Sequence, residues 1–300
     1  MKKVILVTGT SSGLGLSVSI KLAEQGHTVY ASMRNLDKAN QLKQAMINKN
    51  FKIHLIQMDV ESTESITQAV STILNQNGRI DCLINNAGMG FVETTEQASE
   101  EKINQVMNIN FMGVVRTIKA VMPAMRQAKS GQIINITSVG GLIGQPFNEI
   151  YCASKFAVEG LTESMASYIQ PFFNIKFTAI EPGGIVSEFS NNVIKNSNIE
   201  HGSDNDEYAP IFKRYFEEAR NRLNSSTEYS VYQSSDQVAD CVVDVVNSDN
   251  PPLRIRTSEW ADNFCKFKTQ SDPTGNRSVA AVYQLFLARA EETDNVMVDQ

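Results

Sequence analysis

The stretch VILVTGTSSGLGLSVSIKLAEQG, residues 4–26, joins a short apolar run, a glycine-rich turn and an amphipathic helical pattern. Glycine lets the backbone turn sharply and approach a pyrophosphate, whose charge is favoured by the N–H groups at a helix N-terminus. The spacing is GxxxGxG rather than GxGxxG, and any strand-to-helix turn can use glycine. Inside a strand–helix–strand unit, however, the turn predicts a dinucleotide site. The residues expected to line it are Gly9, Ser11, Ser12, Gly13, Leu14 and Gly15.

Apolar runs and helical patterns alternate along most of the chain. Strands that follow one another in this way, each covered by helices on both faces, are typical of a mainly parallel, doubly wound α/β sheet. We see no linker, so we predict one domain over residues 1–300. The strand-like runs occupy residues 2–9, 27–33, 51–60, 79–88, 131–138, 174–184 and 251–258, and the helical patterns occupy 14–25, 36–48, 99–128 and 235–246, with others opening near 62 and 149.

Composition narrows the class of protein. With 300 residues, 42% of them apolar, the chain is long enough for a large core, and a net charge of −6 argues against nucleic acid as a partner. The four cysteines form no CxxC pair and no signal peptide is evident, so we expect a reducing, cytoplasmic compartment. The three histidines lack ligand spacing, so we expect no metal. No apolar run is long enough to predict a membrane span.

Two segments depart from the alternation. Residues 187–232 are polar and irregular around one short amphipathic helix, which is long for a connection inside a compact domain. We interpret this segment as a lid over a binding site, with a surface excursion of no consequence as the alternative. Residues from about 259 to 300 form a C-terminal extension that ends in an amphipathic helix, whose apolar face can pack on the domain or on a second subunit.

The residues after the second and third strands bear on the choice of cofactor. An NAD site normally has an Asp or Glu after the second strand, but this chain has YASMRN there, with Arg34. A guanidinium suits a 2′-phosphate, so we favour NADP(H) over NAD(H), although the same arginine can be a solvated residue at a helix start. Asp59, followed by Val60, can accept from the adenine amino group or simply end its strand.

Small and polar residues follow the next strands. Asn86, Ala87 and Gly88 end the fourth strand, where a cofactor crosses the carboxyl edge of such a sheet. Ser138 follows the fifth strand and therefore belongs to the same edge.

A tyrosine and a lysine open the helix after Ser138. Tyr151 and Lys155 stand at i and i+4, so they share one face of that helix. Taken alone, such a pair occurs on many solvent-facing helices. Together with Ser138, Asn110 and the glycine turn in this order, it favours a catalytic site.

The chemistry of hydride transfer explains these residue types. A tyrosine with a free pKa near 10 is a weak base at neutral pH unless its anion is stabilised. A neighbouring ammonium and a positive nicotinamide ring both stabilise it, so we predict a lowered pKa for Tyr151. Ser138 can hold the substrate oxygen, Lys155 can also bond the nicotinamide ribose, and Asn110 can order a water that relays the proton.

At this point the motifs resemble the short-chain dehydrogenase/reductase family. TGTSSGLG, NNAG, NINF, TSVGG, YCASK and EPGGIVS match its ordered motifs over residues 3–190. The resemblance implies a Rossmann-like sheet of about seven strands in three α/β/α layers and the tetrad Asn110, Ser138, Tyr151 and Lys155. It also implies a nicotinamide loop with Pro182, Gly183, Ile185 and Ser187. Gly184 stands where many members carry a second proline, which predicts a looser loop.

A closer resemblance extends into the C-terminal extension. The stretches SVGGLIGQPFNEIYCASKFAVEGLTESMA and PPLRIRTSEWADNFCKFKTQSDPTGNRSV are similar to the branch with oestradiol 17β-dehydrogenases and photoreceptor-type retinol dehydrogenases. That branch implies NADP(H), a homodimer or homotetramer, and a bulky, apolar alcohol or carbonyl substrate of steroid, retinoid or lipid type. Two alternatives remain. A non-catalytic NADP(H)-sensing protein would usually have lost one of the four polar residues, and a ketoacyl-type reductase does not fit the long extension after residue 190.

Overall fold

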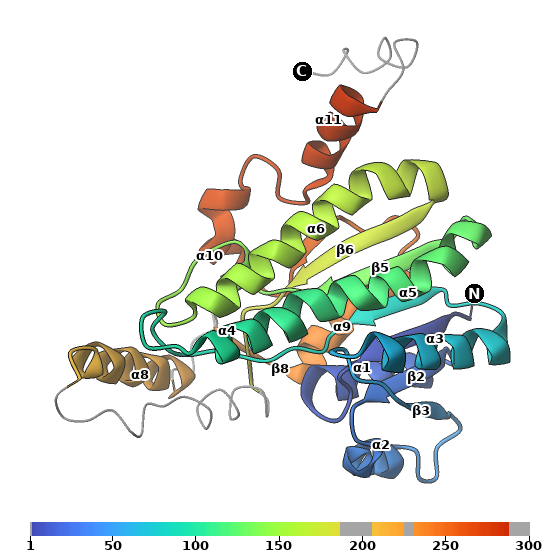
Figure 1. Ribbon diagram of the computed structural model, residues 1–300, viewed down its shortest axis with the longest axis horizontal. Helices are drawn as coiled ribbons and strands as arrows, with labels where there is room; N and C mark the ends of the chain where they lie inside the picture. The colour runs from blue at the N-terminus through green and yellow to red at the C-terminus, as the bar shows by residue number, and fades with distance from the viewer. Residues whose placement is uncertain (1, 187–205, 225–230, 288–300) are drawn as a thin grey trace.

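A parallel sheet of seven strands forms the centre of the protein (Figure 1). The computed structural model describes residues 2–186, 206–224 and 231–287. The strands are β1 (Val4–Thr8), β2 (Thr28–Met33), β3 (Ile53–Gln57), β4 (Cys82–Asn85), β5 (Gly131–Ile136), β6 (Ile175–Glu181) and β9 (Arg254–Arg256). Their order across the sheet is β3-β2-β1-β4-β5-β6-β9, so the winding direction reverses between β1 and β4. This confirms the predicted doubly wound fold.

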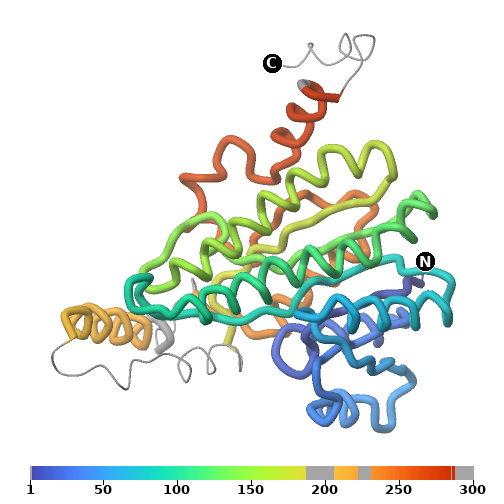
Figure 2. The backbone as a smooth tube through the Cα atoms, in the orientation of Figure 1, coloured from blue at the N-terminus to red at the C-terminus, as the bar shows by residue number. Residues whose placement is uncertain are grey.

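Helices cover both faces of the sheet. One face carries α1 (Gly13–Glu24), α2 (Asn40–Ala45) and α9 (Ser235–Asn247), and the other carries α3 (Thr63–Asn77), α5 (Gly113–Ala128) and α6 (Glu149–Phe173). Along β1, Leu6 packs into the core under α3, α5 and α6, whereas Ile5 and Val7 pack into the core under α1 and α9. The period of two along a strand requires this division. In Figure 2 the blue β2 and β3 lie at one end of the sheet and the yellow β6 lies toward the other, while the orange α9 packs beside the blue α1.

Local sequence explains where several helices begin. The Ser62 side chain accepts from the N–H of Ser65 at the start of α3, and Ser234 forms a capping box with Gln237 at the start of α9. The Ser99 side chain accepts from the N–H of Lys102 at the start of α4 (Glu100–Met107), as Ser62 does at the start of α3. Each cap satisfies an N–H group that the helix itself leaves without a partner and is worth about 1 kcal/mol.

Two segments lie beside the main layers. Within the predicted lid, residues 206–224 form mainly α8 (Ala209–Asn224). A small sheet pairs β7 (Gly184–Val186), just before the lid, with β8 (Tyr232–Ser234) at its end. The ring of Phe212 on α8 stacks on Phe147 at a centroid distance of 4.0 Å. Residues 187–205 and 225–230 lie outside the described residues, so the lid itself stays a prediction.

The C-terminal extension contributes two helices, α10 (Glu259–Thr269) and α11 (Asn276–Phe286). The rings of Trp260 and Phe264 on α10 pack with Val139 and Leu142, next to Ser138. The helix α11 packs on α6, where Tyr283 meets Phe172 (Figure 1). The extension is thus in contact with the segment that follows β5, while the end of the predicted tail lies beyond residue 287.

No helix within residues 2–186, 206–224 and 231–287 is long and apolar enough to cross a membrane.

Candidate active site

The predicted site residues gather at the carboxyl edge of the sheet. The glycine turn follows β1, Asn86 follows β4, Ser138 follows β5 and Pro182 follows β6. Because all these strands are parallel, their carboxyl ends lie at one edge, and β1 and β4 flank the point where the winding reverses. Ligands of doubly wound sheets bind at such a point.

The glycine turn is built for close approach. Gly9 and Gly13 have φ of 68° and 58°, a region in which glycine carries no steric penalty. A Cβ on Gly9 would lie 2.7 Å from the Cα of Ala87, and one on Gly15 would lie 2.4 Å from the Gly9 carbonyl oxygen. The Asn86 side-chain amide donates to that same oxygen at 2.9 Å. Asn86 therefore holds the turn against the loop after β4.

The start of α1 fits the pyrophosphate of a dinucleotide. Ser12 occupies the cap position with extended backbone, but no side-chain hydrogen bond caps the helix and its first turn contains no acidic residue. The N–H groups of this turn therefore remain available to an anion. At Gly88, a Cβ would lie 3.3 Å from Asn110 Oδ1 and 3.8 Å from Lys155 Nζ. Glycine keeps the space beside those two groups open, which suits a ribose there.

The adenosine end carries one exposed arginine. The Arg34 side chain is 64% exposed, and its Nη1 lies 3.5 Å from Oε2 of Glu61. The other carboxylate oxygen of Glu61 accepts from Asn108 Nδ2 at 3.1 Å. A weak, exposed pair of this kind contributes little and leaves the guanidinium able to turn toward a phosphate. Arg34 therefore lies where a 2′-phosphate contact is feasible, with one acid beside it.

Asp59 and Val60 take part in local structure. Oδ1 of Asp59 accepts from the N–H of Glu61 at 3.0 Å. This bond fits the second interpretation of Asp59, a local role at the end of its strand. Val60 is buried against Gly113, and its carbonyl oxygen accepts from Arg116 Nη1 at 3.2 Å. Neither observation tests a contact with adenine.

Asn110 lies in a π-helical turn, Asn108–Met112, between α4 and α5. Its Nδ2 donates to the Met89 carbonyl oxygen at 2.9 Å and to Ser154 Oγ at 3.1 Å, while its Oδ1 accepts from the Met89 N–H at 2.8 Å. These bonds tie the loop after β4 to α6. The side chain of Asn110 is thus engaged mainly with protein groups.

Ser138, Tyr151 and Lys155 meet at the edge of the sheet. The Ser138 hydroxyl accepts from the Gly140 N–H at 3.0 Å and is hydrogen-bonded to Tyr151. Lys155 is 6% exposed, its Nζ donates to the Ile136 carbonyl oxygen at 2.9 Å, and it lies 5.7 Å from the centroid of the Tyr151 ring. The structure therefore brings the four predicted polar residues together.

Burial controls the protonation of this site. It raises the pKa of Tyr151 to about 12, although the hydrogen bond from Ser138 acts in the opposite direction. Burial also lowers the pKa of Lys155 to about 8, against the attraction of Glu159. The protein's own groups therefore shift the tyrosine pKa upward, and the predicted fall, which also relied on a positive nicotinamide ring, stays a prediction. The reason for the upward shift is that burial destabilises the phenolate by removing it from water, and this effect is larger than the stabilisation that the neighbouring groups provide.

The loop after β6 is more tightly packed than expected. The Pro182 carbonyl oxygen accepts from the N–H of Val139, which joins this loop to the turn after Ser138. A Cβ on Gly183 would lie 3.1 Å from the Trp260 ring, and one on Gly184 would lie 2.5 Å from the Tyr232 ring. Gly184 belongs to β7 and its side-chain position is filled by an aromatic ring, so the expected looseness is wrong.

Ile185, the next residue of β7, is half-buried against the core under α1 and α9. Ser187 lies outside the described residues.

Sequence reasoning missed some polar groups of the site. Ser154 bonds Asn110 and also donates to the Tyr151 carbonyl oxygen at 2.7 Å. Ser154 lies directly before Lys155, on the helical turn that carries Tyr151, and this position could have indicated that it belongs to the site. The carbonyl of Ile136 and the main chain of Met89 left no such signal, because a backbone group is the same in every residue type.

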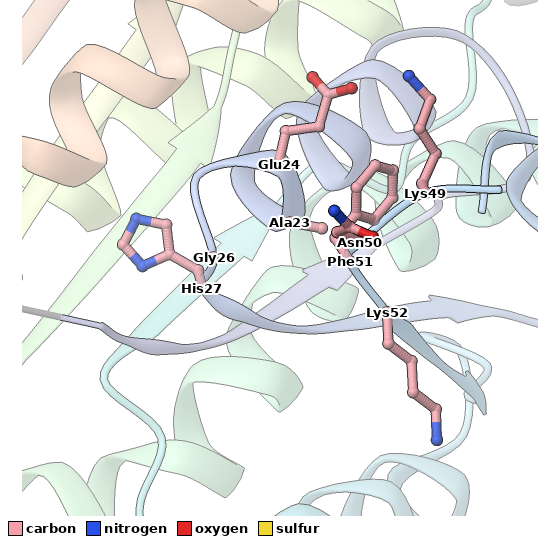
Figure 3. A pocket seen from close by; sticks show the side chains of 8 residues that line it. All are labelled: Ala23, Glu24, Gly26, His27, Lys49, Asn50, Phe51 and Lys52. Carbon is pink, nitrogen blue, oxygen red and sulfur yellow. The ribbon is translucent and has the colours of Figure 1, made fainter.

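A depression lies away from this edge. It has a volume of about 530 Å³ and is lined by the end of α1, the residues just before β2 and the loop before β3 (Figure 3). Figure 3 labels Glu24, His27, Lys49 and Lys52 among its lining residues. These residues precede β2 and β3, so they belong to the amino edge of the sheet, opposite the catalytic candidates. Among the described residues, no group of three or more His, Cys, Asp or Glu side chains could hold a metal.

Comparison with known proteins agrees with this geometry. The profile of the family described as short chain dehydrogenase matches residues 3–198, which is more than half of the chain. This chain belongs to the short-chain dehydrogenase family. Members with named activities are dehydrogenases and reductases, so this short-chain dehydrogenase is an oxidoreductase whose fold binds a nicotinamide cofactor.

Three curated relatives cover most of this short-chain dehydrogenase. The 3-ketodihydrosphingosine reductase of Bacteroides thetaiotaomicron is 38% identical, over 85% of this chain and 87% of the relative. Human retinol dehydrogenase 8 is 35% identical, over 94% and 90%. Human 17-beta-hydroxysteroid dehydrogenase type 1 is 32% identical, over 94% and 85%.

Two solved structures are similar in fold. A short-chain dehydrogenase from Streptomyces avermitilis gives a TM-score of 0.73 at 25% identity, covering 94% of this chain and 97% of that one. Actinorhodin polyketide ketoreductase, solved with NADPH, also gives 0.73, at 26% identity, covering 85% and 95%.

Proposed function

We propose that this short-chain dehydrogenase interconverts an alcohol and its ketone or aldehyde, uses NADP(H) in preference to NAD(H), and acts on a bulky, apolar substrate. The observation that carries this proposal is the contact of Ser138 with Tyr151, one helical turn before Lys155, at the same sheet edge as the uncapped start of α1. A non-catalytic sensor of NADP(H) would have no need of this convergence.

The proposed roles follow from the hydrogen bonds of each group. A bound nicotinamide supplies or accepts the hydride. The Ser138 hydroxyl accepts from the Gly140 N–H and is hydrogen-bonded to Tyr151, and its one proton can turn from Tyr151 to a bound substrate oxygen. The Tyr151 hydroxyl, next to it, gives the proton to a carbonyl oxygen or takes it from an alcohol. Lys155 stabilises the phenolate by its charge and bonds the ribose, and Asn110 positions the loop of Gly88 beside it and supports the proton relay.

The proposed substrate class rests on the relatives and on the surroundings of α6. The relatives' names refer to a ketosphingoid base, a retinol and a steroid, which are all largely apolar molecules. In this chain a mainly aromatic cluster lies next to the N-terminus of α6, and we propose that an apolar substrate binds against it. Its members are Val92, Phe147, Phe212, Tyr215 and Phe216, with Tyr208. An apolar wall with a few polar points is usual in such pockets.

A substrate panel tests the function. Purified protein with NADPH should oxidise the cofactor in the presence of a long-chain 3-keto sphingoid base, retinal or a steroid ketone, and much more slowly with acetone as a small control. Loss of absorbance by NADPH measures the rate. Tight NADPH binding without turnover of any of these substrates would favour the sensor, and preference for an acetoacetyl thioester would favour the ketoacyl-type reductase.

Replacing Arg34 tests the cofactor preference. We expect Arg34→Asp to lower the ratio of kcat/KM for NADPH over NADH by about 10- to 100-fold, because charge-assisted hydrogen bonds are worth roughly 1.5–3 kcal/mol and a carboxylate repels the 2′-phosphate. Lys43→Asp makes the same charge change on the exposed side of α2 and should leave the ratio within about twofold. An unchanged ratio in Arg34→Asp would contradict the assignment.

Assembly and compartment belong to the same proposal. We propose a homodimer or homotetramer in the cytoplasm. Phe156, Tyr168 and Phe172 are exposed along α6, which supports an apolar contact between copies of the chain.

A further inference from the structure

Two buried glutamates meet directly behind the catalytic candidates. Glu159 lies on α6 one turn after Lys155, and Glu181 is the last residue of β6, just before Pro182. They are 8% and 0% exposed, and their carboxyl groups lie close enough together for a hydrogen bond between them. An ionised carboxylate only accepts hydrogen bonds. The contact therefore requires a proton on one of the two groups.

Hydrogen-bond accounting leads to the same requirement. Oε2 of Glu181 accepts from Arg256 Nη1 at 3.0 Å. The Oε1 atoms of Glu159 and Glu181 are buried, and neither accepts a hydrogen bond from the donors around it. Leaving buried acceptors without a partner is costly. One proton shared by the two carboxyl groups satisfies both atoms.

The charges around the pair do not balance without that proton. Arg254 Nη2 lies 3.3 Å from Glu163, and Arg256 Nε lies 2.5 Å from Asp262, so both arginines also serve other acids. Four carboxyl groups thus face two guanidinium groups and one ammonium. The titratable and polar groups that face Glu159 and Glu181 are Lys155 and Glu163 on α6, Arg254 and Arg256 on β9, Asp262 and Cys265 on α10, and Thr137 after β5.

The pair packs against the segments that carry the site. A Cβ on Gly141 would lie 3.0 Å from Glu159 Cγ and 3.2 Å from the Lys155 carbonyl oxygen, so the stem of Glu159 lies against the turn that follows Ser138. Glu181 leads directly into the loop of Pro182 and Gly183. A change in the charge of the pair therefore acts on Lys155, on the Ser138 turn and on the loop after β6 together.

We propose that Glu159 and Glu181 share one proton and act as a positioning pair for Lys155 and Ser138, a role that rests on the catalytic functions proposed above for those residues. With the proton in place, the pair joins α6, β6 and β9 by hydrogen bonds. Without that proton, two negative carboxylates lie close together in a buried space and repel each other. Glu159 then also attracts the ammonium of Lys155. The pair touches neither substrate nor cofactor, so its effect on catalysis is indirect.

The sign of the pH dependence follows from burial. Burial raises the pKa of Glu159 to about 8 and raises the pKa of Glu181, whereas an unfolded glutamate titrates near 4.5. A raised folded pKa gives stability that is fully present below the unfolded value and is lost as the pH rises toward the folded value. The wild-type protein should therefore lose stability between about pH 5 and pH 8, by at most about tenfold in the unfolding constant per pH unit for one proton.

Infrared spectroscopy of the full chain tests the shared proton directly. We expect the C=O stretching band of a protonated, buried carboxylic acid at pH 7 in the wild-type protein, fading as the pH passes about 8. Glu159→Gln keeps a donor to Glu181 without a titrating group, so it should lack the band. The matched control Glu64→Gln makes the same change at an exposed position on α3, away from the pair, and should retain the band. A wild-type spectrum without the band overturns the shared proton even if no variant folds, and a band that persists in folded Glu159→Gln does the same.

Unfolding and kinetics test the positioning role. In Glu159→Gln, the pH-dependent loss of stability between pH 5 and 8 should disappear. The kcat/KM profile should keep the ionisation of Lys155 but with a lower pKa, because Glu159 no longer attracts its charge. The exposed control Glu64→Gln should keep both the pH-dependent loss of stability and the kinetic ionisation unchanged. Identical pH profiles in the wild type and Glu159→Gln would overturn the positioning role. If no turnover of any carbonyl substrate is found, the proposed function fails, while the infrared band and the unfolding curves still decide whether the proton is shared.

Discussion

Tyr151→Phe should reduce kcat by at least about a thousandfold and leave the affinity for NADPH nearly unchanged. General acid–base catalysis is worth roughly 10²–10⁴-fold, and only the hydroxyl is removed here. The phenyl ring still fills its place on α6, so the pocket keeps its shape. Initial rates with the best carbonyl substrate measure kcat, and quenching of protein fluorescence by NADPH measures affinity.

The control for this change lies on the same helix. Tyr168 is 43% exposed, so Tyr168→Phe makes the identical chemical change at the surface and should leave both quantities within about twofold. Full turnover by Tyr151→Phe would show that another group moves the proton. Loss of NADPH affinity along with turnover would instead point to collapse of the site.

Lys155→Met should harm both turnover and cofactor binding. Methionine has nearly the length of lysine but no charge and no donor, so it removes the phenolate-stabilising charge and the bond to the ribose. A hydrogen bond to a charged group is worth roughly 1.5–3 kcal/mol, so we expect NADPH affinity to fall by about 10- to 100-fold and kcat by about a hundredfold or more. The same titration and rate measurements as for Tyr151→Phe give both numbers.

The comparison of the two variants separates the roles of the two residues. Tyr151→Phe should lower kcat alone, whereas Lys155→Met should lower both kcat and the affinity for NADPH. Lys119→Met, on the exposed side of α5, removes a lysine without touching the site and should change neither. Unchanged NADPH affinity in Lys155→Met would remove the ribose contact from the mechanism.

Much of this arrangement was predictable because it depends on local patterns. The short continuous apolar runs between helical patterns predicted strands with two buried faces, and the structure shows Leu6 and Ile5 in different cores. Ser138 was expected at the same sheet edge as the glycine turn because both follow parallel strands. The four-residue spacing placed Tyr151 and Lys155 on one helix face. The roles assigned to these residues stay predictions until the variants are measured.

Other features depend on solvent exclusion, which no local pattern encodes. The pKa of Tyr151 rises because several elements bury it. Gly184 is packed because the Tyr232 ring, 48 positions further along the chain, fills its side-chain space. Nothing in the sequence distinguishes Glu159 from an ordinary acidic residue on a helix.

The sequence by itself determined the doubly wound α/β fold, the carboxyl edge as the site and the order of the polar residues along it. Those properties follow from periodicity and from the parallel direction of successive strands. Only the tertiary structure decided the protonation of the site and the meeting of Glu159 with Glu181, because α6, β6 and β9 come together through packing between distant parts of the chain. Charge in a protein depends on what surrounds it, and those surroundings exist only once the chain has folded.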